Sequence, residues 1–206
     1  MKAQLKWVTP KAELEIVEIA RVSSKRTDKR EEPENLIKYL INHKHWSPFE
    51  MANMCIDIEC SVAVGRQILR HKSFSFQELS QRYIEVPGIE EVEYYMQDSG
   101  SNRQTSSVQV LESSFLREQI AEHITDSLVL YKNLLAAGVS RECARYVLPM
   151  ATTTRMYMNG NVRSWIHFLQ ARLDKSHVQV EHYELAFRIK EIFKQQFPII
   201  SKALNL

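Results

Sequence analysis

Residues 54–69, MCIDIECSVAVGRQIL, contain a change of hydrophobic period that sets the type of fold. From Met54 to Glu59 apolar and polar side chains alternate, which predicts a half-buried strand. Ser61 follows, and its hydroxyl can accept the hydrogen bond that begins a helix, which we expect to continue to about Leu69. The segment therefore predicts a strand that leads directly into a helix.

The segments on either side repeat this mixture of short strands and helices. Pro33 suits the first turn of a helix, and Gly138 suits the end of a long one. No strand–helix–strand unit recurs, so the pattern favours a single α+β domain over residues 1–206 rather than a doubly wound sheet. The expected strands are 3–8, 54–59, 91–96 and 151–158, the expected helices are 13–22, 33–43, 61–69, 111–137, 162–172 and 177–196, and 99–107 is expected to be a polar connection.

The composition is that of an ordinary globular protein. The 206 residues are 44% hydrophobic and 25% charged, which argues against disordered and fibrous classes. Three cysteines without a paired spacing give little support for disulfides or a zinc site. The first residues, MKAQLKWVTPKAELE, become charged too early for a secretory signal, and no apolar run approaches the ~20 residues of a membrane helix. We expect a soluble, cytoplasmic protein that does not bind membranes.

The 27 basic and 25 acidic residues give a net charge of +2, but the positive charge is concentrated in two windows. Between Arg66 and Arg82 four basic residues accompany one acidic residue, a local charge of +3. Between Arg141 and Arg172 five arginines accompany one glutamate, a local charge of +4. Near-neutrality argues against a general nucleic-acid binder, whereas the two arginine-rich windows favour small, discrete anions.

Five polar side chains in the first window have spacings that favour a binding site. Gln67 and Arg70 project together from the predicted helix, and Glu78, Ser80 and Arg82 would share one side of an extended backbone. Arginine forks fit phosphate oxygens, and a Gln or Glu side chain can read a pyrimidine edge through paired hydrogen bonds.

The same stretch equally fits a basic surface loop. In that case Phe74, Phe76 and Tyr83 would pack in the core, whereas in a binding site they would supply stacking surface. The residues alone leave both interpretations open.

The second window places a cation on an apolar helical face. Trp165, Leu169 and Arg172 share that face, where a guanidinium is costly unless it has an anionic partner. The partner could be a phosphate, a flavin or an ionised base, or a salt bridge to Asp174 or Glu181.

The segment RHKSFSFQELSQRY, residues 70–83, closely resembles the signature of the flavin-dependent thymidylate synthases, in which RHR is followed after seven residues by serine. Here the matching residues are Arg70, His71 and Ser80, with Lys72 in the third position. Further blocks resemble the family in the same order and span nearly the whole chain: ARVS (20–23), HKHWSPFE (43–50), ARYVLP (144–149), NVRS (161–164) and RLDKSH (172–177).

The resemblance implies a central, mostly antiparallel sheet flanked by long helices. It also implies methylation of dUMP to dTMP, with methylenetetrahydrofolate as carbon donor and FAD, reduced by NADPH, as hydride source. The family forms a homotetramer with the flavin at subunit interfaces, so that each site combines residues of different chains.

The resemblance further assigns residues to roles. The dUMP contacts are expected at Gln67, Ile68, Leu69, Arg70, Glu78, Leu79, Ser80, Gln81, Arg82, Arg145 and Arg172. The FAD contacts are expected at Ser23, His45, Ser47, Arg70, His71, Lys72, Glu78, Asn161, Val162, Arg163 and His167. Arg172, Ser80 and Arg70 are the expected catalytic residues, with Arg172 favouring ionisation of uracil N3, and no metal is expected.

Two residues depart from the family pattern. Lys72 keeps the charge of the usual arginine but lacks its planar fork, and His167 stands where asparagine is common. The family polarises uracil electrostatically instead of using a cysteine nucleophile. We therefore interpret Cys55, Cys60 and Cys143 as packing residues.

Two other classes of function remain possible at this stage. One is a flavoprotein oxidoreductase without methyl transfer, although no GxGxxG loop is present for a Rossmann cofactor site. The other is a single-stranded nucleic-acid-binding module, against which the acidic remainder of the chain and the polar residues in both windows argue.

Overall fold

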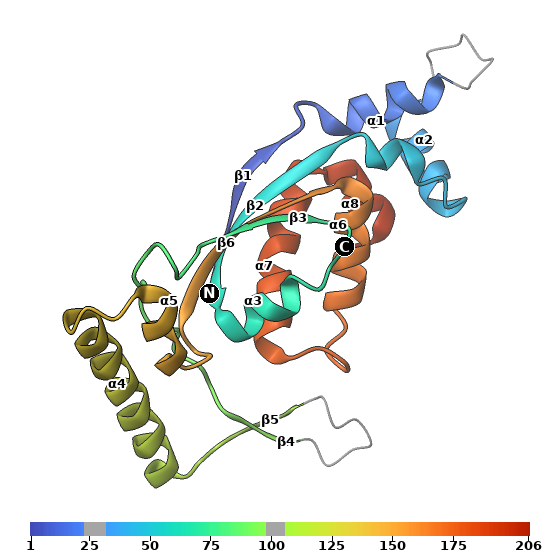
Figure 1. The fold of residues 1–206 in the computed structure, drawn as a ribbon. Coiled ribbons are helices and arrows are strands. Elements are labelled where there is room, and N and C mark those ends of the chain that lie inside the picture. The colour runs from blue at the N-terminus through green and yellow to red at the C-terminus, as the bar shows by residue number, and fades with distance from the viewer. Residues whose placement is uncertain (23–31, 98–105) are drawn as a thin grey trace.

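Two long antiparallel strands form the centre of the fold. β2 (Asn53–Ser61) and β6 (Thr153–Asn161) pair over their whole length, from Asn53 opposite Asn161 to Ser61 opposite Thr153. β1 (Lys2–Val8) adds to β2 and β3 (Ser75–Glu78) adds to β6, which gives an antiparallel sheet of order β1-β2-β6-β3. The computed structural model describes residues 1–22, 32–97 and 106–206 (Figure 1).

Each central strand ends in the residue that caps the following helix. Ser61 Oγ accepts a hydrogen bond from the backbone N–H of Val64 at 3.3 Å, which begins α3 (Val62–Ile68). Asn161 Oδ1 accepts one from the backbone N–H of Ser164 at 2.8 Å, which begins α6 (Val162–Arg172). Because the strands are antiparallel, the two helices start at opposite ends of the sheet.

One face of the sheet is covered by the C-terminal helices α6, α7 (Val180–Gln196) and α8 (Pro198–Leu204), as Figure 1 shows. Trp165 of α6 is fully buried there, and its indole N–H donates to the backbone carbonyl of Met54 at 2.9 Å. The apolar core joins the sheet to these helices through residues such as Met54, Ile56, Ile58, Met156, Met158, Trp165, Phe168, Leu185, Phe193 and Phe197.

The N-terminal helices extend this core at one end. α1 (Ala12–Arg21) and α2 (Pro33–Asn42) pack beside η1 (Ser47–Glu50) and α8. The buried Glu13 of α1 accepts a hydrogen bond from the backbone N–H of Ile200 at 2.7 Å, and burial raises the pKa of this carboxyl.

The long helix α4 and the short helix α5 stand apart from the sheet (Figure 1). α4 (Ser114–Ala136) ends before Gly138, whose positive φ of 85° suits a residue without a side chain. α5 (Arg141–Ala144) and η2 (Arg145–Val147) follow and pack against it. Within the described parts of the chain, no helix is long and apolar enough to cross a membrane.

The expected α+β class is confirmed, and so are the main expected helices and three of the four expected strands. The predicted start of the strand expected at 91–96 is wrong: residues 91–94 are irregular, and the strand β4 spans Tyr95–Gln97. β4 pairs with β5 (Ser106–Val110) rather than with the central sheet. The connection expected at 99–107 lies outside the described residues as far as 105, and its last two residues begin β5.

Gly160 provides a test of the packing between β6 and the loop that follows α3. An added Cβ would lie 2.5 Å from Cε1 of Phe74, whose ring is held against Trp165 at a centroid separation of 4.7 Å. We expect Gly160→Ala to lower the free energy of unfolding by about 1–3 kcal/mol, measured by urea denaturation. The matched control is Gly88→Ala, since a Cβ there meets nothing within 4 Å; equal stability of the two variants would contradict this account.

Candidate functional site

A half-buried arginine and a histidine meet between α3 and α6. Arg172, the last residue of α6, donates a hydrogen bond from Nε to Nε2 of His71 at 2.9 Å. His71 lies in the turn that follows α3, where its backbone N–H bonds to the carbonyl of Ile68 at 3.0 Å. Its ring packs against that of Phe168, with centroids 5.0 Å apart.

This contact pairs a cation with a neutral group. Burial, and then the charge of Arg172, lowers the pKa of His71 to about 4. His71 is therefore neutral near pH 7, with Nε2 as an acceptor for the guanidinium. Burial, and then the neighbouring Arg70, lowers the pKa of Arg172.

The salt bridge considered for Arg172 is not formed. Among the described residues, neither Asp174 nor Glu181 pairs with it; Asp174 instead accepts hydrogen bonds from Ser176. A half-buried guanidinium with only a neutral partner favours an anionic ligand, because burial without an opposite charge is costly.

Next to this pair, the amide of Gln67 is held by two side chains of α7 and its N-cap. Gln67 Nε2 donates to Oε1 of Gln179, and Gln67 Oε1 lies 3.1 Å from Nδ1 of His182. His182 is fully buried, and its ring lies 6.2 Å from that of His71. Gln67, His71 and Arg172 thus form one connected group, which we call the α3–α6 cluster; Arg70 lies beside it, is exposed, and perturbs the pKa of Arg172.

The remaining residues expected to bind the nucleotide lie at the end of β3 and after it, and near α5. β3 ends at Glu78, whose Oε1 accepts from Thr154 Oγ1 at 3.0 Å. Leu79 continues the pairing with a backbone hydrogen bond to the carbonyl of Arg155 at 2.8 Å. A cavity of about 380 Å³ opens here and is lined by Gln77, Glu78, Leu79, Ser80, Tyr83, Ile84, Arg155 and Tyr157.

The expectation that Glu78, Ser80 and Arg82 share one side of an extended backbone is wrong beyond Ser80. The backbone N–H groups of Tyr83 and Ile84 both bond to the carbonyl of Ser80, which closes a turn. Arg82 is turned towards α5, where its Nη2 lies 3.0 Å from Glu142 Oε2. The spacing argument failed because a turn ends the alternation of side chains.

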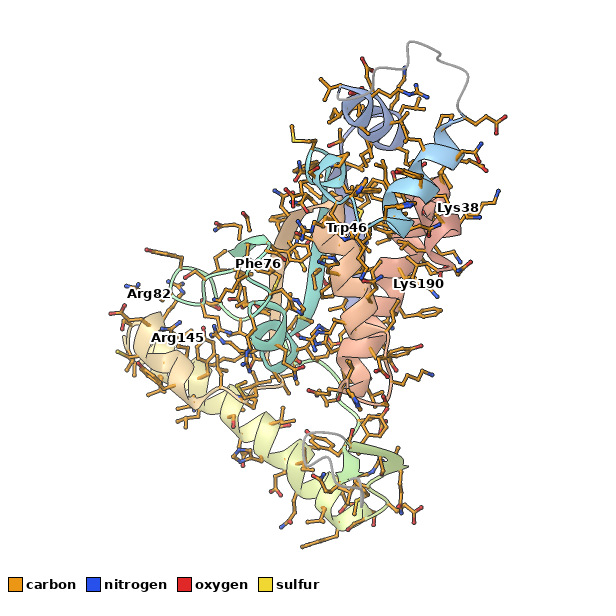
Figure 2. The ribbon with its side chains drawn as sticks, turned by 90° about the vertical axis from the view of Figure 1, so that its right-hand side faces the viewer. Lys38, Trp46, Phe76, Arg82, Arg145 and Lys190 are labelled. Atoms are coloured by element: carbon orange, nitrogen blue, oxygen red, sulfur yellow. The ribbon has the colours of Figure 1, made fainter. Side chains whose placement is uncertain are left out.

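Arg145 belongs to the same group as Arg82. Its Nε donates to the backbone carbonyl of Glu142 at 3.3 Å, so both arginines contact Glu142. Figure 2 shows them side by side near α5, on the far side of Phe76 from Trp46. We call Glu78–Arg82 with Arg145 the α5 cluster; no hydrogen bond or ion pair between described residues joins it to the α3–α6 cluster.

The residues expected to contact FAD gather along α6. Arg163 pairs with Glu50 of η1, and the ring of His167 packs on Trp46 at 5.6 Å, next to His45 and Ser47. Ser164 Oγ donates to the carbonyl of Ser73 at 3.3 Å, which holds the turn containing His71 and Lys72 against the same helix.

Five of the residues expected to contact FAD are exposed: His45, Ser47, Arg70, Lys72 and His167. Their N–H and O–H donors fit a large anion such as a diphosphate.

Some expected contacts have other roles or cannot be placed here. Ile68 and Val162 are fully buried, so neither residue is exposed to a ligand in this chain. Asn161 caps α6 through its side-chain oxygen. The carboxylate of Glu78, at the end of β3, accepts from Thr154, and Ser23 falls outside the described residues.

The three aromatic residues of residues 70–83 differ in burial. Phe74 is buried and Phe76 packs against the core, whereas Tyr83 is 75% exposed. Cys55 and Cys60 are buried packing residues, but the same interpretation is wrong for Cys143, which is exposed on α5.

Sequence reasoning missed Gln179, His182 and Glu142. His182 could have been found, because it interrupts an apolar stripe of α7 whose other buried members include Leu185, Ala186, Ile189 and Phe193. A histidine on such a stripe needs a hydrogen-bond partner. Gln179 and Glu142 carry no comparable signal.

The fold is close to those of solved nucleotide methylases. The UMP/dUMP methylase PolB from Streptomyces cacaoi, bound with 5-Br UMP, superposes with a TM-score of 0.83 and 26% sequence identity, covering 98% of this chain and 92% of that one. The neighbour therefore shares nearly the whole architecture.

Sequence comparison identifies the family. The family model described as thymidylate synthase complementing protein matches residues 4–199. The flavin-dependent thymidylate synthase of Synechocystis sp. is 42% identical over 190 residues, 90% of this chain and 86% of the relative. That of Thermosipho melanesiensis is 39% identical over 190 residues, 88% of this chain and 81% of the relative. The chain belongs to the thymidylate synthase complementing protein family, and is thus a member of a family of flavin-dependent methyltransferases.

The buried histidine makes stability depend on pH. Burial, and then the charge of Arg172, lowers the pKa of His182 to about 3, whereas an unfolded histidine titrates near 6.5. The resulting stabilisation is present above pH 6.5 and is lost as the pH falls towards 3. From pH 7 to 4.5 we expect the wild-type protein to lose about 2 kcal/mol more unfolding free energy than His182→Asn, measured by urea denaturation.

The exposed His43 at the end of α2 supplies the control. A His43→Gln variant should lose as much stability as the wild-type protein over the same pH range. Equal losses in the wild-type protein and the His182→Asn variant would contradict the assignment.

Proposed function

We propose that this protein methylates dUMP reductively to dTMP, with methylenetetrahydrofolate as carbon donor and FAD, reduced by NADPH, as hydride source. The observation that carries the proposal is the half-buried Arg172, which has a neutral histidine as its partner and the amide of Gln67 nearby. Such a group stabilises negative charge that develops on a bound ring. The relatives named flavin-dependent thymidylate synthases and the UMP/dUMP methylase neighbour support the same reaction.

In this proposal the α3–α6 cluster binds the uracil ring. Arg172 favours ionisation at N3, because its charge stabilises the anionic ring, and Gln67 contacts the edge of the base. His71 keeps Arg172 oriented by accepting from its Nε. Arg70 completes the cation set on this side, and Leu69 lines it, with Ile68 buried beside it.

The α5 cluster binds the remainder of the nucleotide and completes the site. Arg82 and Arg145 supply guanidinium groups for phosphate, and Ser80 lies at the rim of the adjoining cavity. Glu78, Leu79 and Gln81 provide the further contacts.

The FAD set along α6 holds the flavin. His45, Lys72 and His167 offer exposed donors to the flavin diphosphate, and Arg163 adds a guanidinium that can leave its pair with Glu50. Ser23, Ser47, Arg70, His71, Glu78, Asn161 and Val162 complete the proposed contacts. When bound, FAD supplies the hydride for the reduction. The lysine at 72 binds as a point charge in place of the usual arginine fork.

We propose that the protein acts as a homotetramer. No hydrogen bond or ion pair between described residues joins the α3–α6 cluster to the α5 cluster, and in this proposal the α5 cluster of another subunit completes each nucleotide site. Residues 1–206 then contribute one domain to each subunit, organised around one apolar core. The three free thiols suit a reducing compartment, the cytoplasm of the organism or, for a virus, of its host.

The reaction is tested by tritium release from 5-³H-dUMP in the presence of methylenetetrahydrofolate and NADPH. Purified protein should show the visible absorption of bound flavin and release tritium in step with dTMP formation. A flavin-loaded protein that oxidises NADPH without tritium release would instead be an oxidoreductase. A colourless protein with salt-sensitive oligonucleotide binding would be a nucleic-acid-binding module.

Cys143 provides a separate test of the electrostatic mechanism. Although Cys143 is exposed near the α5 cluster, we assign it no role, because Arg172 activates the ring. A Cys143→Ala variant should therefore keep turnover within about twofold of the wild-type value, as expected for a surface substitution. Loss of turnover in a variant that still binds FAD would indicate a cysteine nucleophile.

A further inference from the structure

His182 is a polar side chain in the interior of the molecule. It is fully buried on α7, between the rings of Phe168 and His71 at centroid distances of 6.0 and 6.2 Å. Its Nδ1 contacts Gln67 Oε1 at 3.1 Å, and its Nε2 has no hydrogen-bond partner among the described residues. A buried polar atom without a partner is uncommon and calls for a reason.

The contacts of Gln67 settle which ring nitrogen carries the proton. An amide oxygen can only accept, so the histidine must donate from Nδ1–H to Gln67 Oε1. On its other side Gln67 donates from Nε2 to the oxygen of Gln179, which also can only accept. The two contacts therefore require the same orientation of the Gln67 amide.

The opposite orientation of the amide is blocked. Rotation by half a turn would place N–H against N–H at His182 and oxygen against oxygen at Gln179. To avoid both repulsive contacts, the amide of Gln179 would have to rotate as well, and the proton of His182 would have to move to Nε2. At Nε2 the buried N–H would have no acceptor. Nearby Arg172 also disfavours added positive charge on the ring.

The fixed amide keeps one N–H and one oxygen lone pair for a ligand. When it binds, before Arg172 favours ionisation at N3, the neutral uracil ring presents the donor N3–H next to a carbonyl acceptor, which matches this pair. Cytosine presents an unprotonated N3 next to an amino group, so both contacts would be repulsive. A freely rotating glutamine would accept either base, because its amide could turn over.

We propose that His182 is a positioning residue that fixes the Gln67 amide and so makes the nucleotide site select uracil over cytosine. The inference rests on the proposed function, in which Gln67 contacts the base edge. His182 itself does not touch the nucleotide; it acts through Gln67, as an indirect determinant of specificity.

Two substitutions distinguish the effect of the Nδ1–H donor of His182 from the effect of the volume of its ring. His182→Asn keeps an N–H donor near the position of Nδ1, whereas His182→Leu fills similar space without a polar atom. Dissociation constants of dUMP and dCMP are measured by calorimetry on FAD-loaded protein. We expect the ratio of the two constants to fall roughly tenfold or more in His182→Leu, the effect of one mispaired buried hydrogen bond, and to stay near the wild-type ratio in His182→Asn.

Bound flavin and melting temperature report whether each variant is folded. If a folded His182→Leu variant discriminates against dCMP as the wild-type protein does, the inference is overturned and His182 is only a packing residue. If the wild-type protein binds FAD but neither nucleotide, the proposed function fails instead.

The tautomer is measured independently on the wild-type protein, so the test does not depend on the folding of any variant. Imidazole ¹⁵N–¹H NMR spectra of the full-length protein should show His182 protonated at Nδ1 alone near pH 7. Protonation at Nε2 alone would overturn the inference, because the amide of Gln67 would then have the opposite orientation.

Discussion

The contact between Arg172 and His71 is the interaction on which the candidate site depends. A guanidinium at the end of α6 is partly buried, and its partner is an imidazole that burial keeps neutral. The positive charge is held in place but not neutralised. In the proposed function, a site built in this way stabilises negative charge on a bound ring without a covalent nucleophile.

The fold places this contact through its two central strands. β2 leads through the Ser61 cap into α3 and the turn that contains His71, and β6 leads through the Asn161 cap into α6 and Arg172. The two helices start at opposite ends of the antiparallel pair, yet the end of α6 meets the end of α3. The buried Trp165, bonded to the carbonyl of Met54, fixes α6 on the sheet. α7 then places His182 and, at its N-cap, Gln179 against Gln67.

Local patterns predicted much of this arrangement. The alternation in 54–59, the cap at Ser61 and the apolar face with Trp165 depend on neighbours in sequence, and the structure confirms them. The direction of Arg82 depends on Glu142, 60 residues away, and the orientation of Gln67 depends on His182, 115 residues away. Such long-range contacts leave little trace in local spacing. The exposure of Cys143 likewise follows from how α5 packs, which its own sequence does not determine.

In the proposed assembly, one subunit's α3–α6 cluster is completed by another subunit's α5 cluster. Subunit complementation tests it most directly: Arg172→Ala and Arg145→Ala chains, each inactive alone, are mixed by refolding or co-expression and assayed for dTMP formation. If the clusters come from different subunits, random assembly restores about one quarter of the wild-type sites, since each site needs both intact contributors. If both clusters of one chain served the same site, no mixed assembly would contain an intact site, and the mixture would remain inactive.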